Sequence, residues 1–125
     1  MIFGIGNDIV EISRIANVYA KYKDRFARKI LTPQELLIFK DKLNSPNFLA
    51  KRFAAKEALA KALGIGIRKP FGFQSISIIN NSLGKPIFNF NNEIQEFLNQ
   101  KKIQNCHLSI SDEKTLASAV VILEQ

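Results

Sequence analysis

The stretch that organises this chain is Arg52-Phe-Ala-Ala-Lys56-Glu57-Ala-Leu-Ala-Lys61-Ala-Leu-Gly64-Ile-Gly66. Its alanines and leucines predict an α-helix from about residue 48 to residue 63, with an apolar face made of Ala55, Ala58, Leu59 and Ala62. Glu57 and Lys61 lie one turn apart on the opposite face. Gly64 and Gly66 then end the helix in a loop that allows positive φ and a close approach of other groups to the backbone.

This combination of a carboxylate, an ammonium and a glycine loop has two interpretations. A cation next to free backbone N–H groups suits phosphate, a carboxylate suits a divalent cation, and Mg²⁺ commonly joins one or two carboxylates to substrate phosphates. The simpler interpretation is a surface ion pair, worth roughly a few tenths of a kcal/mol, followed by a helix-ending glycine. The helix alone does not decide between them.

The first ten residues predict an apolar strand that contains an acid. Gly4 and Gly6 interrupt this strand, as glycines do at a bulge or where another group comes close. They are not a dinucleotide fingerprint, because no third glycine follows at the required spacing. Asp8 stands before Ile9 and Val10, and a carboxylate among apolar neighbours requires a cation or hydrogen-bond donors. The alternative is that Asp8 caps the following helix.

Taken together, these segments resemble the holo-acyl-carrier-protein synthases, the small bacterial type of 4′-phosphopantetheinyl transferase. The matching stretches appear in family order and span nearly the whole chain: residues 4–15, 28–35, 52–67, 84–86 and 107–111. The resemblance implies an α+β fold, an antiparallel sheet covered by helices. It also implies trimers with active sites between subunits.

The activity implied by the resemblance is transfer of 4′-phosphopantetheine from coenzyme A to a serine of apo-acyl carrier protein, with release of 3′,5′-ADP, in support of fatty acid biosynthesis. Asp8 and Glu57 match the Mg²⁺ ligands, and Glu57 and Lys61 match the catalytic positions. The proton acceptor is left open between Glu57 and a water on the metal. The positions matching coenzyme A contacts are Arg52, Lys61, Gly64, Gly66 and Ser109. For carrier-protein docking, Arg14 matches the family helix, and Lys21, Arg25 and Phe26 are carried over from an approximate match.

Two positions depart from the family pattern. Asp112 stands where the family commonly has a second His near a coenzyme A phosphate, and it would repel that phosphate unless Lys114 or another cation compensates. His107 matches only the first His of the motif, and a strand histidine that merely forms a hydrogen bond is the simpler interpretation. Ile65 replaces the usual Thr between the glycines, so that only backbone donors are expected there.

Size and charge limit the remaining possibilities. With 125 residues, 46% of them hydrophobic, the chain is expected to form a single domain over residues 1–125. The longest apolar run, residues 119–123, is far too short to cross a membrane, and Cys106 is the lone cysteine. We therefore expect a cytoplasmic protein. Residues 1–69 hold 14 Lys and Arg against 6 Asp and Glu, a net charge of +8, which predicts an anionic partner.

Two other functions are compatible with parts of this pattern. The basic half and the interleaved Tyr19, Tyr22 and Phe26 would suit a nucleic-acid-binding domain, but the chain has no RNP-like aromatic motif and no zinc ligands. That function would also leave Asp8 and Glu57 unexplained, and we expect neither a nucleic-acid partner nor a membrane partner. An interaction module that has lost catalysis would explain the two departures.

Hydrophobic spacing predicts the remaining elements. We expect strands at residues 74–79, 86–90, 106–111 and 116–123, the first of which Phe71 and Phe73 could extend. We expect helices at residues 14–27, 33–43 and 92–102. Ser13 and Asn92 are the expected caps of the first and last of these helices, and Thr32 and Glu35 should form a capping box at the second.

Overall fold

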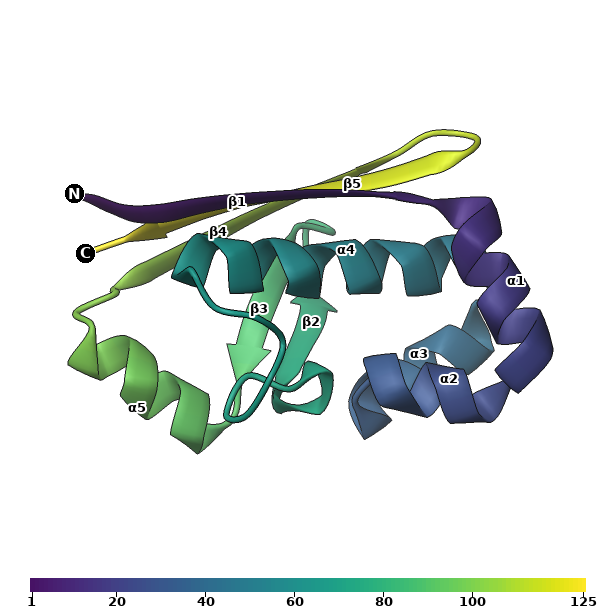
Figure 1. Ribbon diagram of the computed structural model, residues 1–125, viewed down its shortest axis with the longest axis horizontal. Coiled ribbons are helices and arrows are strands. Elements are labelled where there is room, and N and C mark those ends of the chain that lie inside the picture. Colours follow the sequence, from purple (N-terminus) through teal and green to yellow (C-terminus); the bar gives the residue numbers. More distant parts are fainter.

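The computed structural model describes residues 1–125, which fold into five helices, five strands and one short 3₁₀ turn (Figure 1). The strands form two antiparallel sheets, one with the order β1-β5-β4 and one made of β2 and β3. The bounds are β1 Ile2–Glu11, α1 Ile12–Tyr22, α2 Asp24–Ile30, α3 Pro33–Asp41, α4 Pro46–Leu63, η1 Phe73–Ser75, β2 Ile76–Asn80, β3 Pro86–Phe90, α5 Asn92–Gln100, β4 Asn105–Asp112 and β5 Leu116–Glu124. The predicted α+β architecture is confirmed.

The long helix α4 lies under the β1-β5-β4 sheet and forms the centre of the molecule (Figure 1). Its predicted apolar face is buried, since Ala55, Ala58 and Leu59 have no exposed surface and Ala62 is 5% exposed. These residues belong to a cluster of 26 buried hydrophobic residues that spans helices and both sheets. Burial nevertheless extends further round α4 than an amphipathic pattern predicts, because Arg52 and Lys56 are buried as well.

The strand β1 crosses α4 in backbone-to-backbone contact. A Cβ atom on Gly4 would lie 1.9 Å from the Ala62 carbonyl oxygen, and one on Gly6 would lie 1.8 Å from the Ala58 carbonyl oxygen. No side chain fits at those distances, so the close approach predicted from the two glycines is confirmed. This contact sets the position of Asp8, two residues further along β1, relative to α4.

The predicted helix at residues 14–27 is wrong in one respect, because the structure has two helices there. Lys23 separates α1 from α2 with φ 52° and ψ −130°. Lys23 is neither Gly nor Pro, so the sequence carries no ordinary signal for the break. Ser13 is not the cap of α1 either: the helix starts one residue after Glu11, and no side chain caps it.

Two smaller expectations also need correction. Phe71 and Phe73 do not extend β2, because Phe73 opens the 3₁₀ turn η1 and Phe71 forms only an isolated bridge with Arg68. The cap of α5 is Asn91 rather than Asn92, since its side chain accepts a hydrogen bond from the Ile94 N–H. The capping box of Thr32 and Glu35 is confirmed.

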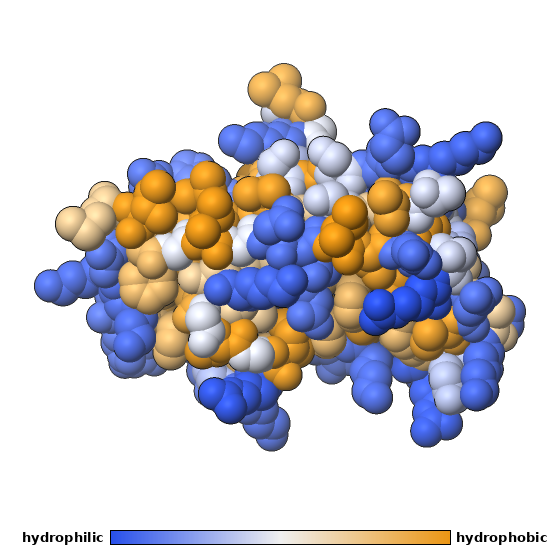
Figure 2. All heavy atoms as spheres, turned by 45° about the horizontal axis from the view of Figure 1, so that its top comes forward, coloured by the Kyte–Doolittle hydropathy of each residue, from blue (hydrophilic) through white to orange (hydrophobic).

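The outer face of the β1-β5-β4 sheet has no helix over it. Ile5 is 66% exposed and Ile9 is 62% exposed, and Phe3 lies on the same face. Figure 2 turns this layer toward the viewer and shows apolar side chains gathered in groups between polar ones. Elsewhere in the fold, no helix combines the length and apolar character needed to cross a bilayer.

Candidate active site between β1 and α4

The crossing of β1 and α4 brings Asp8, Glu57 and Lys61 together. Lys61 Nζ donates hydrogen bonds to Asp8 Oδ1 and to the Asn7 carbonyl oxygen, each over 3.0 Å. The Lys61 side chain is 55% exposed, whereas that of Asp8 is 15% exposed. The site therefore joins a well-anchored carboxylate to a cation on a long, solvent-accessible stem.

Glu57 completes this group and interacts with both neighbours. Its pKa is raised, chiefly by partial burial and then by repulsion from Asp8, while attraction to Lys61 lowers it. Two carboxylates that repel one another beside a single ammonium form a hard-oxygen donor set with an excess of negative charge. No cluster of three or more His, Cys, Asp and Glu ligands occurs in the structure. Two carboxylates without a complete protein cage fit Mg²⁺, which keeps its other positions for water and substrate phosphate.

The glycine loop after α4 offers fewer donors than its sequence indicates. Gly64 adopts a left-handed conformation, with φ 74°, and its N–H donates to the Lys61 carbonyl oxygen over 3.0 Å. The Ile65 N–H donates to the Ala60 carbonyl oxygen over 3.0 Å, which completes a Schellman cap. The Gly66 N–H makes no hydrogen bond within the chain and remains available.

Arg52 does not join this site within one subunit. It precedes Lys61 by nine residues, about half a turn round the helix, and so lies on the other side of α4. Its guanidinium stacks 4.4 Å from the centre of the Phe48 ring, its Nε lies 3.6 Å from Glu35 Oε2, and that Nε has no hydrogen-bond partner. Arg52 lines a pocket of about 620 Å³ together with Lys42 and Lys51. This is a second, separate cationic surface.

Lys56 is the main residue that the sequence interpretation missed. It is completely buried, and its Nζ donates to Glu35 Oε1 over 2.6 Å, to the Ile30 carbonyl oxygen over 2.7 Å and to the Phe73 carbonyl oxygen over 2.9 Å. Burial lowers the pKa of Lys56, and the attraction of Glu35 partly offsets this. A signal was present, because Lys56 shares a helical stripe with Leu59, Ala60 and Leu63. Its partner Glu35 lies 21 residues away and could not be read from that stripe.

His107 and Ser109 of β4 lie on the opposite face of the sheet from Asp8. Leu108 is buried toward α4, so its neighbours His107 and Ser109 are on the outer face and exposed. His107 Nε2 contacts Glu124 Oε1 on the adjacent strand. Asp112, the residue that departs from the family pattern, has its Oδ1 4.0 Å from Lys51 Nζ. The cation beside Asp112 is therefore Lys51 rather than Lys114. Ser109 and Lys61 are consequently not brought together within one subunit.

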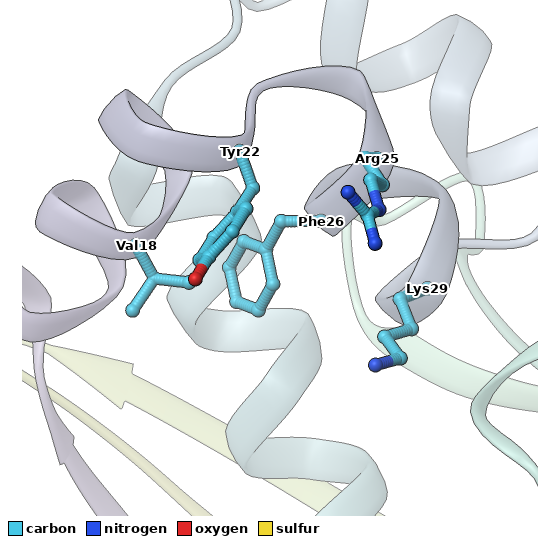
Figure 3. A pocket seen from close by; sticks show the side chains of 5 residues that line it. All are labelled: Val18, Tyr22, Arg25, Phe26 and Lys29. Carbon is cyan, nitrogen blue, oxygen red and sulfur yellow. The ribbon is translucent and has the colours of Figure 1, made fainter.

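The predicted docking residues spread over α1 and α2. Arg25 and Phe26 line a pocket of about 410 Å³ with Val18, Tyr22 and Lys29. Figure 3 shows the Tyr22 and Phe26 rings beside one another and beside Val18, with the Arg25 and Lys29 cations farther along α2. Lys21 Nζ lies 5.2 Å from the centre of the Tyr22 ring. Arg14 lines a different hollow, with Ile9 and Leu116. An apolar floor bordered by cations suits an acidic partner that carries apolar side chains.

Comparison with known proteins agrees with this fold. The model of the 4′-phosphopantetheinyl transferase superfamily matches residues 4–120, and the chain belongs to that family. Within it, the chain is 50% identical over 125 residues to a holo-[acyl-carrier-protein] synthase of Nitrosospira multiformis, with all of both chains covered. The sequence-based resemblance to these synthases is thereby confirmed.

Solved structures give the same result. The crystal structure of the holo-[acyl-carrier-protein] synthase from Neisseria meningitidis superimposes with a TM-score of 0.96 at 46% identity over all of both chains. The synthase from Helicobacter pylori, solved in complex with coenzyme A, gives a TM-score of 0.84 at 36% identity, covering 96% of this chain and 99% of the other.

Proposed function

We propose that this chain is a Mg²⁺-dependent holo-acyl-carrier-protein synthase. It transfers 4′-phosphopantetheine from coenzyme A to a serine of apo-acyl carrier protein, and so supports fatty acid biosynthesis. The observation that carries this proposal is the convergence of Asp8, Glu57 and Lys61 at the β1–α4 crossing. Full-length relatives named as such synthases support the same reaction.

In the proposed reaction the serine Oγ attacks the β-phosphorus of coenzyme A. A new Oγ–phosphorus bond forms, the bond to the bridging pyrophosphate oxygen breaks, and 3′,5′-ADP leaves. Phosphoryl transfer depends mainly on positioning and on neutralising charge. Asp8 and Glu57 would hold Mg²⁺, which supplies charge neutralisation at the pyrophosphate. Lys61 binds a phosphate oxygen, and the free Gly66 N–H is a second donor within the same loop region. Glu57 is the protein side chain that can accept the serine proton, and solvent water is the alternative acceptor.

We propose that the protein is a homotrimer with active sites between subunits. The number three comes from the family resemblance, and self-association is supported by the uncovered apolar face of Phe3, Ile5 and Ile9. It is also supported by the positions of Arg52 and Ser109, which face away from Lys61 in one subunit and would need a second copy to reach the same coenzyme A. Sedimentation equilibrium of the chain and of an Ile5→Asp variant tests this, with a smaller species expected for the variant.

Carrier protein is proposed to dock on Arg14, Lys21, Arg25 and Phe26. The cations would steer an acidic partner, and the pocket containing Phe26 would receive an apolar side chain. The proposed compartment is the cytoplasm, which suits a lone cysteine held as a free thiol.

One assay tests the proposed activity and its metal dependence. The purified chain is incubated with apo-acyl carrier protein, coenzyme A and Mg²⁺, and the mass of the carrier protein is then measured by mass spectrometry. A gain of one phosphopantetheinyl group on a serine is expected, with none in excess EDTA. An unmodified carrier, together with tight and salt-sensitive binding of the chain to nucleic acid, would favour the nucleic-acid-binding alternative instead.

A further inference from the structure

The contact between Lys61 and Asp8 has a consequence for how this site is filled. In the free chain, Lys61 already occupies Asp8 Oδ1 at 3.0 Å. We infer that Lys61 is a placeholder cation, which must leave Asp8 before a divalent cation can bind tightly and which then moves to the pyrophosphate. This inference rests on the proposed metal role of Asp8 and Glu57.

The exposure of the two side chains indicates which one moves. Asp8 is 15% exposed and lies on β1, which Gly4 and Gly6 hold against the α4 backbone. Lys61 is 55% exposed, and both of its acceptors belong to β1, so it can leave without disturbing the packing of α4. The carboxylate is therefore the fixed partner and the ammonium is the exchangeable one.

The distances make simultaneous occupation unfavourable. Mg²⁺ binds carboxylate oxygen at about 2.0–2.1 Å. An ammonium 3.0 Å from the same oxygen would then lie within about 5 Å of a doubly charged ion, where like charges repel strongly even in a partly aqueous site. A bound metal therefore favours release of Lys61 from Asp8.

The charge balance couples metal binding to coenzyme A binding. Asp8, Glu57 and Lys61 together carry a net charge of −1, and a divalent ion alone would change this to +1. The pyrophosphate of coenzyme A is a diester with two negative charges, so metal and pyrophosphate together return the site to −1. Metal binding and coenzyme A binding should consequently strengthen one another, and part of that coupling passes through Lys61.

Removal of the Lys61 charge separates this role from a purely structural one. Mn²⁺ serves as the probe, and electron paramagnetic resonance measures the concentration of free Mn²⁺ and hence the Mn²⁺ affinity. The titration is done with and without coenzyme A, and carrier protein is left out of both. In the absence of coenzyme A, Lys61→Met is expected to tighten Mn²⁺ binding by about tenfold, since one repelling charge is gone. Lys40→Met, on an exposed residue of α3 remote from the site, is the matched control and should change Mn²⁺ affinity by less than about twofold.

The second part of the experiment measures the coupling. In the unaltered chain, coenzyme A should strengthen Mn²⁺ binding by more than it does in Lys61→Met, because only the unaltered chain has an ammonium to transfer. Mn²⁺ affinity that is equal or weaker in Lys61→Met without coenzyme A would overturn the inference. Circular dichroism checks that the variant is folded, and Lys61→Gln replaces it if it is not.

Failure of the proposed metal site would look different. If Asp8→Asn bound Mn²⁺ as tightly as the unaltered chain, Asp8 would not be a ligand, and the metal role in the proposed function would be refuted together with the inference. If Asp8→Asn lost Mn²⁺ binding while Lys61→Met left it unchanged, the metal role would stand and only the placeholder role of Lys61 would be refuted.

Discussion

The helix α4 carries two lysine–carboxylate pairs that differ in almost every physical respect. Lys56 is completely buried and donates to a carboxylate and to two carbonyl oxygens, so its ammonium protons all have acceptors. Lys61 is more than half exposed and binds one carboxylate and one carbonyl oxygen. The same residue type thus holds the fold together at one position and remains exchangeable at the other.

The difference follows from what surrounds each carboxylate. Glu35 also accepts hydrogen bonds from the Thr32 and Ile78 N–H groups, so it joins α3, α4 and β2 and has no exposed surface. Asp8 has Glu57 as a second, repelling carboxylate beside it, so its cation only partly balances the charge. A saturated pair stabilises structure, whereas an unbalanced and accessible pair can bind a ligand.

The largest expected effect comes from removing a carboxylate of the exposed pair. Asp8→Ala and Glu57→Ala should each lower carrier modification by about a thousandfold or more, because each removes one proposed ligand of the charge-neutralising metal. The melting temperature should stay within a few degrees of that of the unaltered chain. Mass spectrometry of the carrier over time measures the rate, and undiminished turnover in either variant would contradict the roles assigned here.

The buried pair should respond in the opposite manner. Lys56→Met should lower the free energy of unfolding by about 3–5 kcal/mol, because it leaves a buried carboxylate without its main cation. Urea unfolding at fixed chain concentration measures this, and activity per folded molecule should change little. Lys51→Met, on a half-exposed residue of the same helix, is the control and should cost less than about 1 kcal/mol. An equal loss in both variants would show that burial does not separate the two kinds of lysine.

Charge reversal on α1 and α2 should give a moderate effect on one substrate only. Arg14→Glu combined with Arg25→Glu should raise the KM for carrier protein by about tenfold, since an acidic partner is no longer attracted. The KM for coenzyme A should be nearly unchanged, because the β1–α4 site lies on other elements. Raising the salt concentration should reduce activity at low carrier concentration in the unaltered chain more than in the variant. Equal weakening of both substrates would instead indicate that these helices line the coenzyme A site.

Asp112→His should have the smallest effect. This substitution frees Lys51, which lies 4.0 Å from Asp112 Oδ1, and removes a negative charge where the family commonly has His. The KM for coenzyme A should fall by roughly two- to threefold or stay the same, since attraction across a half-exposed site is modest. A large loss of activity would show that Asp112 has a role of its own, in the ion pair with Lys51 or between subunits.

Short-range signals carried the correct sequence predictions. Glu57 and Lys61 share a helix, one turn apart, and Gly4 and Gly6 indicated a close approach near Asp8. That Asp8 meets Glu57 and Lys61 was implied by the family resemblance, because the residues lie more than 45 positions apart in the sequence. The position of Arg52 could have been inferred too, because two side chains nine residues apart on a helix point to opposite sides of it. The family resemblance grouped Arg52 with Lys61 without saying that they face opposite ways in one subunit.

Long-range contacts account for what was missed. Glu35 was recognised only as part of a capping box, and nothing local identifies Lys56 as its partner across the core. No local sequence signal predicts the break between the helices at Lys23 either. Lysine has no conformational preference for positive φ, so the packing of α1 and α2 holds it there. Likewise, the pairing of Asp112 with Lys51 depends on how β4 lies along α4.

The contact of Gly4 and Gly6 with α4 also affects how the site tolerates mutation. Main-chain atoms of the strand touch main-chain atoms of the helix, so the spacing between Asp8 and Glu57 does not depend on the size of any side chain between them. Substitutions in the surrounding core, at Phe39 or Leu49 for example, can loosen the molecule without retuning that spacing. Such variants should lose the folded population before they lose turnover per folded molecule. Changes in the core therefore act on the stability of the fold rather than on the geometry of the site, as long as these two positions keep no side chain.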